Sequence, residues 1–251
     1  MGREYARLGA KVVLTARRAS RLEDLASEIG DGGGEALALA CDVTDPAELK
    51  SAVAETIDRF GRVDHVQANA GFGVAGWVHK LSVDDFRRQL ETNVIGVLNT
   101  VQATRAALVE SRGCLALMGS VNSYVALPGI SAYSMSKHAV AALAMSLRHE
   151  LGVQGVSVTL VAPGFVRSEI RRVDNRGRLT EQAHDPIPDW LCMDADKAAR
   201  KIVRAVRRGR RVAVITGHGK LAVFLQRHFP GLTFWLVGRF GIRGRREPTS
   251  K

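Results

Sequence analysis

Short runs of β-branched and aliphatic residues alternate with longer amphipathic stretches along most of this chain. That order is typical of βαβ units, in which helices join parallel strands and cover both faces of the sheet. Pro46 suits a first helical turn, and Asp194 suits an N-cap. The pattern predicts one α/β domain built on a doubly wound parallel sheet. The predicted strands are 11–15, 35–40, 63–68, 114–118, 156–161 and 211–215, and the predicted helices are 19–29, 46–60, 83–110, 131–151 and 194–208.

Two segments depart from this pattern. Residues 165–193 are polar, rich in Arg, Asp and Pro, and have no clean period, so they are predicted to be a substrate loop. Residues 217–251 mix apolar side chains with His, Arg and Gly. We interpret them as a basic, apolar tail that packs on its own domain or on a partner subunit, or that lies on an anionic membrane surface. Residues 1–216 are the predicted folded domain.

Positive charge is concentrated near the C-terminal end. From Lys197 onward the chain has 15 Lys and Arg against one acid, Glu247, although its overall formal net charge is only +11. No helix-turn-helix, zinc-finger or aromatic RNA-binding motif accompanies these charges, so no nucleic-acid partner is predicted.

Cysteine usage and hydropathy indicate a cytoplasmic protein. The three cysteines include no CxxC pair, so neither a disulfide framework nor a metal site is predicted. No apolar run reaches the roughly 18 residues of a membrane span, and the charged start does not resemble a signal peptide. The tail is a candidate for peripheral membrane contact.

A hydroxyl, a phenol and an ammonium group occur together between Ser120 and Lys137. Ser120 follows a predicted strand, and Tyr133 and Lys137 lie four residues apart on the next predicted helix, which places them on one face. A nearby ammonium lowers the pKa of a phenol from about 10 and makes it usable as a proton donor or acceptor. An amphipathic helix that carries Tyr and Lys by chance is the alternative.

This segment resembles the signature of the short-chain dehydrogenase/reductase family, whose YxxxK motif reads Tyr133-Ser-Met-Ser-Lys137 here, with the family serine at Ser120. The resemblance covers nearly the whole chain. It implies a Rossmann-like fold, with residues 1–216 as a dinucleotide-binding and catalytic domain, and hydride transfer to or from a nicotinamide cofactor. The other family landmarks, in order, are Asp42-Val43, Asn69-Ala70-Gly71, Asn93 and Pro163-Gly164.

The resemblance assigns catalytic roles to four residues. Tyr133 is expected to exchange a proton with the substrate oxygen, which Ser120 holds and polarises. Lys137 is expected to lower the pKa of Tyr133 and to bind the nicotinamide ribose. Asn93 is expected to bind a water that connects Lys137 to solvent, with an exposed or capping Asn as the alternative.

The resemblance also implies cofactor contacts at the carboxyl ends of predicted strands. Asp42, with Val43 beside it, is expected to contact adenine, although an Asp that opens the turn before Pro46 also explains its position. The backbone of Val166 is expected to meet the nicotinamide amide, and Ser168 to bond the amide or a phosphate. The remaining implied contacts are Asn69, Ala70, Gly71, Tyr133, Lys137, Pro163 and Gly164.

Arg17 and Arg18 lie at the end of the first predicted strand, where family members that prefer NAD generally have an acid. Residues 14–18 contain no acid, and a guanidinium group suits a 2′-phosphate. We therefore expect NADP(H) to be preferred over NAD(H). Arg18 could instead be solvated near the next helix.

Two family features are absent from the sequence. Ala68 stands where the family usually has the first of two asparagines. The first strand and the TGxxxGxG turn, which binds the pyrophosphate, are missing, and Met1 falls inside the first helix. That strand would lie between residues 11–15 and 63–68. A start further upstream, a fragment and a protein that has abandoned nucleotide binding each explain the difference.

The sequence thus predicts an NADP-preferring oxidoreductase that interconverts a ketone or aldehyde with an alcohol. The alternative is a catalytically silent module that binds through its basic, apolar tail. A homo-oligomer through residues 83–110 and 131–151 is a further family expectation. A small or lipophilic carbonyl substrate is predicted from apolar side chains that packing explains equally well: Phe72, Val74, Trp77, Val125, Leu127 and Trp190.

Overall fold

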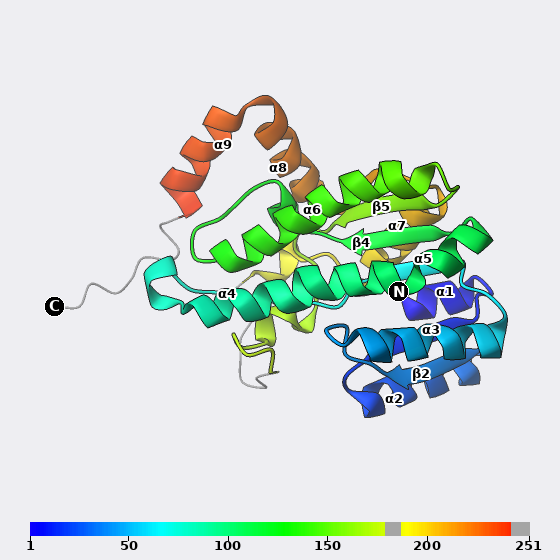
Figure 1. Cartoon of the computed structure of the whole chain (residues 1–251). Coiled ribbons are helices and arrows are strands. Elements are labelled where there is room, and N and C mark those ends of the chain that lie inside the picture. The colour runs from blue at the N-terminus through cyan, green and yellow to red at the C-terminus, as the bar shows by residue number, and fades with distance from the viewer. Residues whose placement is uncertain (179–186, 242–251) are drawn as a thin grey trace.

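Parallel strands with helices on both faces are present in the computed structural model, which describes residues 1–178 and 187–241 and confirms the predicted α/β fold (Figure 1). The strands are β1 (Val12–Ala16), β2 (Ala36–Ala40), β3 (His65–Ala68), β4 (Cys114–Met118), β5 (Ser157–Ala162) and β6 (Val212–Val214). The helices are α1 (Gly2–Arg7), α2 (Ala19–Asp31), α3 (Pro46–Phe60), α4 (Val83–Leu90), α5 (Gly96–Ser111), α6 (Ser131–Gly152), α7 (Ala195–Arg207), α8 (Gly217–His228) and α9 (Pro230–Leu236).

The strands form two parallel groups. In one group β1 pairs with β2, and in the other the order is β3-β4-β5-β6. Helix α1 lies beside both groups: it packs on β1, and the Tyr5 hydroxyl accepts a hydrogen bond of 2.8 Å from Gln67 Nε2 on β3. That a further strand belongs between β1 and β3 stays a prediction.

Helix ends form where the sequence provides caps. Asp45 accepts hydrogen bonds from the backbone N–H groups of Ala47 and Glu48 at the start of α3, and Pro46 occupies its first turn. Asp194 caps α7 in the same way, as predicted. Gly61 ends α3 with a φ of 81°, a left-handed conformation that glycine adopts without steric penalty.

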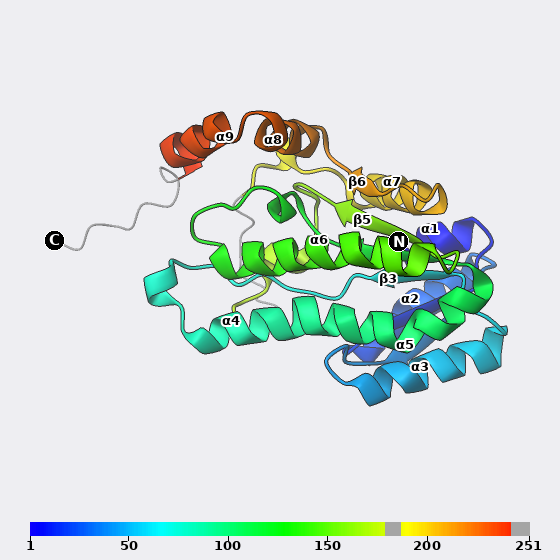
Figure 2. The ribbon, with the colours of Figure 1, turned by 45° about the horizontal axis from the view of Figure 1, so that its top comes forward.

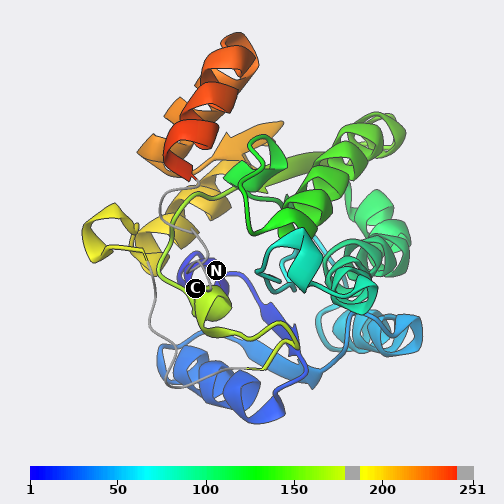
Figure 3. The same ribbon diagram turned by 90° about the vertical axis from the view of Figure 1, so that its left-hand side faces the viewer.

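Two apolar layers hold the helices on the second group of strands. Helices α5 and α6 pack on one face of this group and α7 packs on the other, whereas α2 packs on β1 and β2 (Figure 3). Leu108 of α5 and Val140 of α6 are fully buried against Leu115 and Leu117 of β4. Each such side chain contributes about 1.5–3 kcal/mol through burial. The layers therefore fix the positions of the strand ends.

The predicted helix 83–110 is interrupted by a π-helical segment, Glu91–Ile95, between α4 and α5. Such a segment adds a residue to one turn and frequently occurs at functional sites. Here it includes Asn93, which is fully buried. The π-helical segment was not predictable from the apolar pattern alone.

The tail contains helices that the sequence analysis did not predict. Helix α8 packs on the turn after β4, with Val223 buried and the Arg227 guanidinium 5.0 Å from the centre of the Tyr124 ring. Helices α8 and α9 extend from the β6 side of the molecule (Figure 2). Within the described residues no helix is both long and apolar enough to cross a membrane. The rest of the predicted tail, 242–251, and residues 179–186 of the predicted substrate loop lie outside them.

Candidate active site

The candidate site lies at the carboxyl ends of β4 and β5. Backbone hydrogen bonds connect the segments that leave these strands: Gly119 N donates to Val161 O (2.8 Å) and Val121 N donates to Pro163 O (2.9 Å). Both strands are almost completely buried. The residues that follow them are therefore held on rigid elements.

Ser120, Tyr133 and Lys137 come together because a short 3₁₀ turn, Val121–Ser123, and then α6 follow β4. Ser123 joins the two elements, since its hydroxyl donates to Lys137 O (2.7 Å) and accepts from Ser120 N (3.2 Å). Lys137 Nζ donates to Met118 O (2.8 Å) and lies 5.6 Å from the centre of the Tyr133 ring. The predicted proximity of these groups is present in the structure.

Burial dominates the ionisation of the two groups on α6. It raises the pKa of Tyr133, although a hydrogen bond to Ser120 and the charge of Arg171 act in the opposite direction. Burial also lowers the pKa of Lys137 to about 8. The expected lowering of the Tyr133 pKa is therefore not found, because loss of hydration outweighs the neighbouring charges and Lys137 donates to a backbone carbonyl.

Asn93 and Gln89 hold the loop that follows β3. The Asn93 carbonyl accepts from Phe72 N (3.1 Å), and its amide donates to Phe72 O (3.0 Å) and to Ser136 Oγ (3.1 Å). Gln89 accepts from Val74 N (2.6 Å) and donates to Phe72 O (2.9 Å). Asn93 is therefore neither exposed nor capping, and its side chain positions the loop next to α6.

Arg17 and Asp42 approach each other at the ends of β1 and β2. Arg17 Nη1 lies 3.8 Å from Asp42 Oδ2. Burial acts to raise the pKa of Asp42, but hydrogen bonds from Thr44 and the charge of Arg17 outweigh it and lower the pKa. Asp42 Oδ1 accepts from Thr44 N and Oγ1, so this carboxylate also opens the turn before α3. Arg18 instead pairs with Glu169, at 3.2 Å.

The predicted cofactor contacts that follow β2 and β3 are either exposed or closely packed against α5 and the π-helical segment before it. Asn69 and Ala70 are exposed after β3. Gly71 lies so close to Asn93 that a Cβ there would come within 2.8 Å of Asn93 Oδ1. Val43 O accepts from Asn99 Nδ2 (3.1 Å), which ties the turn after β2 to α5.

The turn after β5 is positioned by contacts with the first residues of α8. Phe165 N donates to His218 Nε2 (3.0 Å), and the two rings stack with their centres 5.2 Å apart. Burial lowers the pKa of His218, which favours the neutral ring that accepts this bond. A Cβ at Gly164 would collide with Thr216 and His218, so Pro163-Gly164 allows α8 to approach.

The described part of the predicted substrate loop crosses the strand ends. Val166 pairs with Met193, and Val166 O accepts from Arg171 Nη2 (3.1 Å), whereas Ser168 is exposed. Asn175 accepts from Ala75 N and donates to Ala75 O, each at 2.9 Å. These bonds bring residues 165–178 across to the loop that follows β3.

The apolar residues proposed for a pocket divide into two kinds. Phe72 and Val74 are buried in a cluster with Ala132, beside Tyr133, and Val125 is buried as well. Trp77 and Leu127 are partly exposed. Trp190 is 84% exposed and is therefore not part of a packed pocket wall.

The sequence analysis did not identify several residues that shape the site. Gln89 lies four residues before Asn93, a spacing that places both on one helix face, and Ser123 lies three after Ser120 in a capping-box arrangement. The local spacing of Gln89 and Ser123 could therefore have indicated them. No local pattern indicates His218 or Arg171, because their contacts join segments far apart in the chain.

The donor set fits parts of a dinucleotide. Arg17 suits a phosphate, the Asp42 carboxylate suits an adenine amino group, and the Lys137 ammonium suits ribose hydroxyls. Among the described residues α1 is the first element, and no glycine-rich turn that leads from a strand into it is described. We therefore assign residues to the two ends of the cofactor and none to its pyrophosphate.

Residues 1–178 match the profile of the short chain dehydrogenase family. Dehydrogenase/reductase SDR family member 7B of Bos taurus is 29% identical over 272 residues, covering 100% of this chain and 80% of that protein. The 11-beta-hydroxysteroid dehydrogenase A of Sesamum indicum is 28% identical over 257 residues, covering 98% of this chain and 72% of that protein.

Solved structures are similar over most of the chain. An alcohol dehydrogenase from the archaeon Thermococcus sibiricus, complexed with 5-hydroxy-NADP, has a TM-score of 0.73 and 27% identity, covering 84% of this chain and 87% of that one. A short chain dehydrogenase/reductase from Burkholderia phymatum in complex with NAD has a TM-score of 0.80 at 22% identity, covering 99% and 90%. The second shows a likeness of fold alone.

Proposed function

The chain belongs to the short-chain dehydrogenase family and is thus an oxidoreductase with a nicotinamide cofactor, and on that premise we propose that it interconverts a ketone or aldehyde with an alcohol. We further propose that it prefers NADP(H) and that Tyr133 is its acid/base. The observation that carries the proposal is the convergence of Ser120, Tyr133 and Lys137 at the ends of β4 and β5.

The residues divide the proton chemistry among them. When bound, the cofactor supplies or accepts the hydride. Ser120 holds the substrate oxygen, and the Tyr133 phenol donates its proton to that oxygen as a carbonyl is reduced. Burial raises the pKa of Tyr133, so the phenol is protonated at neutral pH and holds the proton that reduction requires. Lys137, with a pKa of about 8, is charged at pH 7 and stabilises the phenolate that remains.

The cofactor preference is supported by Arg17, whose exposed guanidinium lies beside Asp42. We expect Arg17→Asp to raise the Kd of NADPH about tenfold or more and to change that of NADH by about twofold or less, because only NADPH carries the 2′-phosphate. Fluorescence titration of both cofactors measures this, with Lys50→Asp on α3 as a charge-matched control. Equal changes for the two cofactors would remove the argument.

The same titration on the unaltered chain tests the proposed function. Micromolar NADPH binding, followed by turnover of a carbonyl compound in a substrate screen, is the expected result. A folded chain that binds neither cofactor would contradict the proposal and favour the silent module. The comparisons do not support that module, since the relatives compared are named dehydrogenases and reductases.

We propose residues 1–216 as the catalytic domain and residues 217–241, which comprise α8, α9 and the helical turn after α9, as a peripheral membrane contact. Large apolar side chains are exposed there next to Lys220, Arg227 and Arg239. Co-sedimentation with anionic vesicles that is reversed by salt is the expected result, and no binding at low salt would end the proposal. The exposed apolar side chains are Leu221, Phe224, Phe229, Leu232, Phe234, Trp235 and Phe240.

Formation of a homo-oligomer through residues 83–110 and 131–151 stays a prediction.

A further inference from the structure

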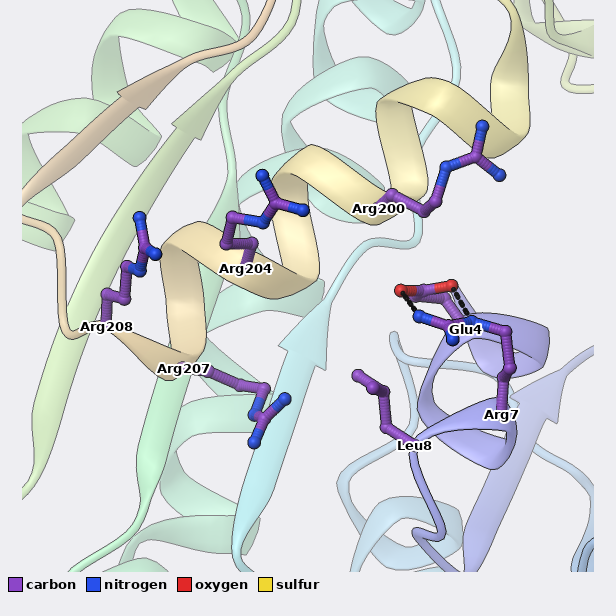
Figure 4. A pocket seen from close by; sticks show the side chains of 7 residues that line it. All are labelled: Glu4, Arg7, Leu8, Arg200, Arg204, Arg207 and Arg208. Carbon is purple, nitrogen blue, oxygen red and sulfur yellow. Dashed lines mark hydrogen bonds and ion pairs between the residues drawn. The ribbon is translucent and has the colours of Figure 1, made fainter.

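A groove with a volume of about 410 Å³ lies between α1 and α7. Five of its seven lining residues are arginines (Figure 4). Only one acidic residue, Glu4, lines it, and the exposed Leu8 supplies its apolar part. The lining residues are Glu4, Arg7 and Leu8 from α1 and the residue after it, and Arg200, Arg204, Arg207 and Arg208 from α7 and the residue after it.

The spacing of the arginines on α7 directs them away from the core. Ile202 and Val206 pack in the apolar cluster on the strands, whereas Arg200, Arg204, Arg207 and Arg208 are all exposed. The Glu4 carboxylate is already engaged by Arg7, at 2.8 and 2.9 Å. No salt bridge to any of the four arginines from α7 occurs among residues 1–178 and 187–241. The lining therefore carries a large uncompensated positive charge.

We propose that this groove binds a small soluble polyanion with two or more phosphate groups. Guanidinium groups bind phosphate oxygens in a bidentate fork, and the adjacent forks along residues 200–208, which make no salt bridge among the described residues, match a ligand with several phosphates. A volume of about 410 Å³ is suited to a molecule of metabolite size.

The groove is separate from the site of the proposed function. Arg7 and Leu8 precede β1, and Arg207 and Arg208 precede β6, so they lie toward the amino ends of the strands. Ser120 follows the carboxyl end of β4. The inference therefore goes beyond the oxidoreductase reaction and does not depend on it.

The shape and composition of the groove favour a small ligand over a nucleic acid. The lining has no aromatic side chain on which a base could stack. It is bounded by two helices, whereas a duplex contacts phosphates along an extended surface. The exposed apolar side chains suited to a membrane lie on α8 and α9, away from the groove residues.

Isothermal titration of the full chain with inorganic tripolyphosphate tests the proposal. We expect saturable binding that weakens as salt is added. The double substitution Arg204→Gln and Arg207→Gln should raise the Kd about tenfold or more, because it removes two phosphate contacts. Glutamine retains the helix propensity of arginine, so α7 should remain folded.

Two controls separate the groove from general charge and from the cofactor site. Lys50→Gln with Arg59→Gln removes the same charge from exposed positions on α3 and should change the Kd by about twofold or less. Arg17→Asp, at the proposed cofactor site, should likewise change the Kd of tripolyphosphate by about twofold or less. The proposal is overturned if either control weakens binding as much as the groove variant does. It is also overturned if the chain binds duplex DNA but not tripolyphosphate.

Discussion

Replacing Tyr133 by Phe is expected to reduce turnover of a carbonyl substrate about a thousandfold, since a positioned acid/base contributes about 10²–10⁴-fold. The ring that packs beside Gly73 is kept, and only the hydroxyl near Ser120 is removed. Cofactor affinity should therefore change by about twofold or less. Steady-state kinetics at saturating substrate give the first value, and fluorescence titration gives the second.

Tyr124→Phe provides a matched control. Tyr124 is also partly buried at the carboxyl end of β4, but its ring faces Arg227 of α8 rather than Lys137. The same loss of a hydroxyl there should leave most turnover intact. If Tyr133→Phe keeps turnover close to that of the control while both variants stay folded, Tyr133 is not the acid/base and the proposed mechanism is wrong.

Much of this fold was predictable because its signals are local. Apolar runs gave β4 and β5, and Pro46 and Asp194 marked the starts of α3 and α7. Helices α8 and α9 were missed, because their mixture of apolar and basic residues has no clean helical period and α8 depends on packing against the turn after β4. Tertiary contacts decided the structure there.

Only the part of the candidate site that depends on local spacing was predictable from the sequence. Tyr133 and Lys137 share a helix face, so their proximity follows from a spacing of four residues. The bond from Phe165 N to His218 joins residues 53 apart in the chain, and no local pattern indicates it. Nor could the sequence show that burial outweighs charge at Tyr133, because desolvation depends on everything packed around the phenol.

Lys137→Met is expected to alter the pH dependence of stability as well as to reduce turnover. Burial lowers the pKa of Lys137 from 10.5 to about 8 in the folded protein. Between about pH 8 and 10.5 the unfolded chain therefore binds a proton that the folded chain does not, so the free energy of unfolding rises with pH. Below pH 8 both states are protonated, and folding bears the full desolvation penalty of the charged side chain.

The wild-type protein should thus gain about 3 kcal/mol of unfolding free energy relative to Lys137→Met between pH 7 and 10.5. Urea unfolding of both proteins across this range measures the difference. Loss of the hydrogen bond to Met118 O changes the unfolding free energy of the variant by the same amount at every pH. The other titrating groups are present in both proteins, so they do not contribute to the difference. Lys50→Met, at an exposed position, should show no such trend. Parallel pH profiles for wild type and Lys137→Met would mean that burial does not lower the pKa of Lys137 in the folded state, and the predicted gain in stability with pH would be wrong.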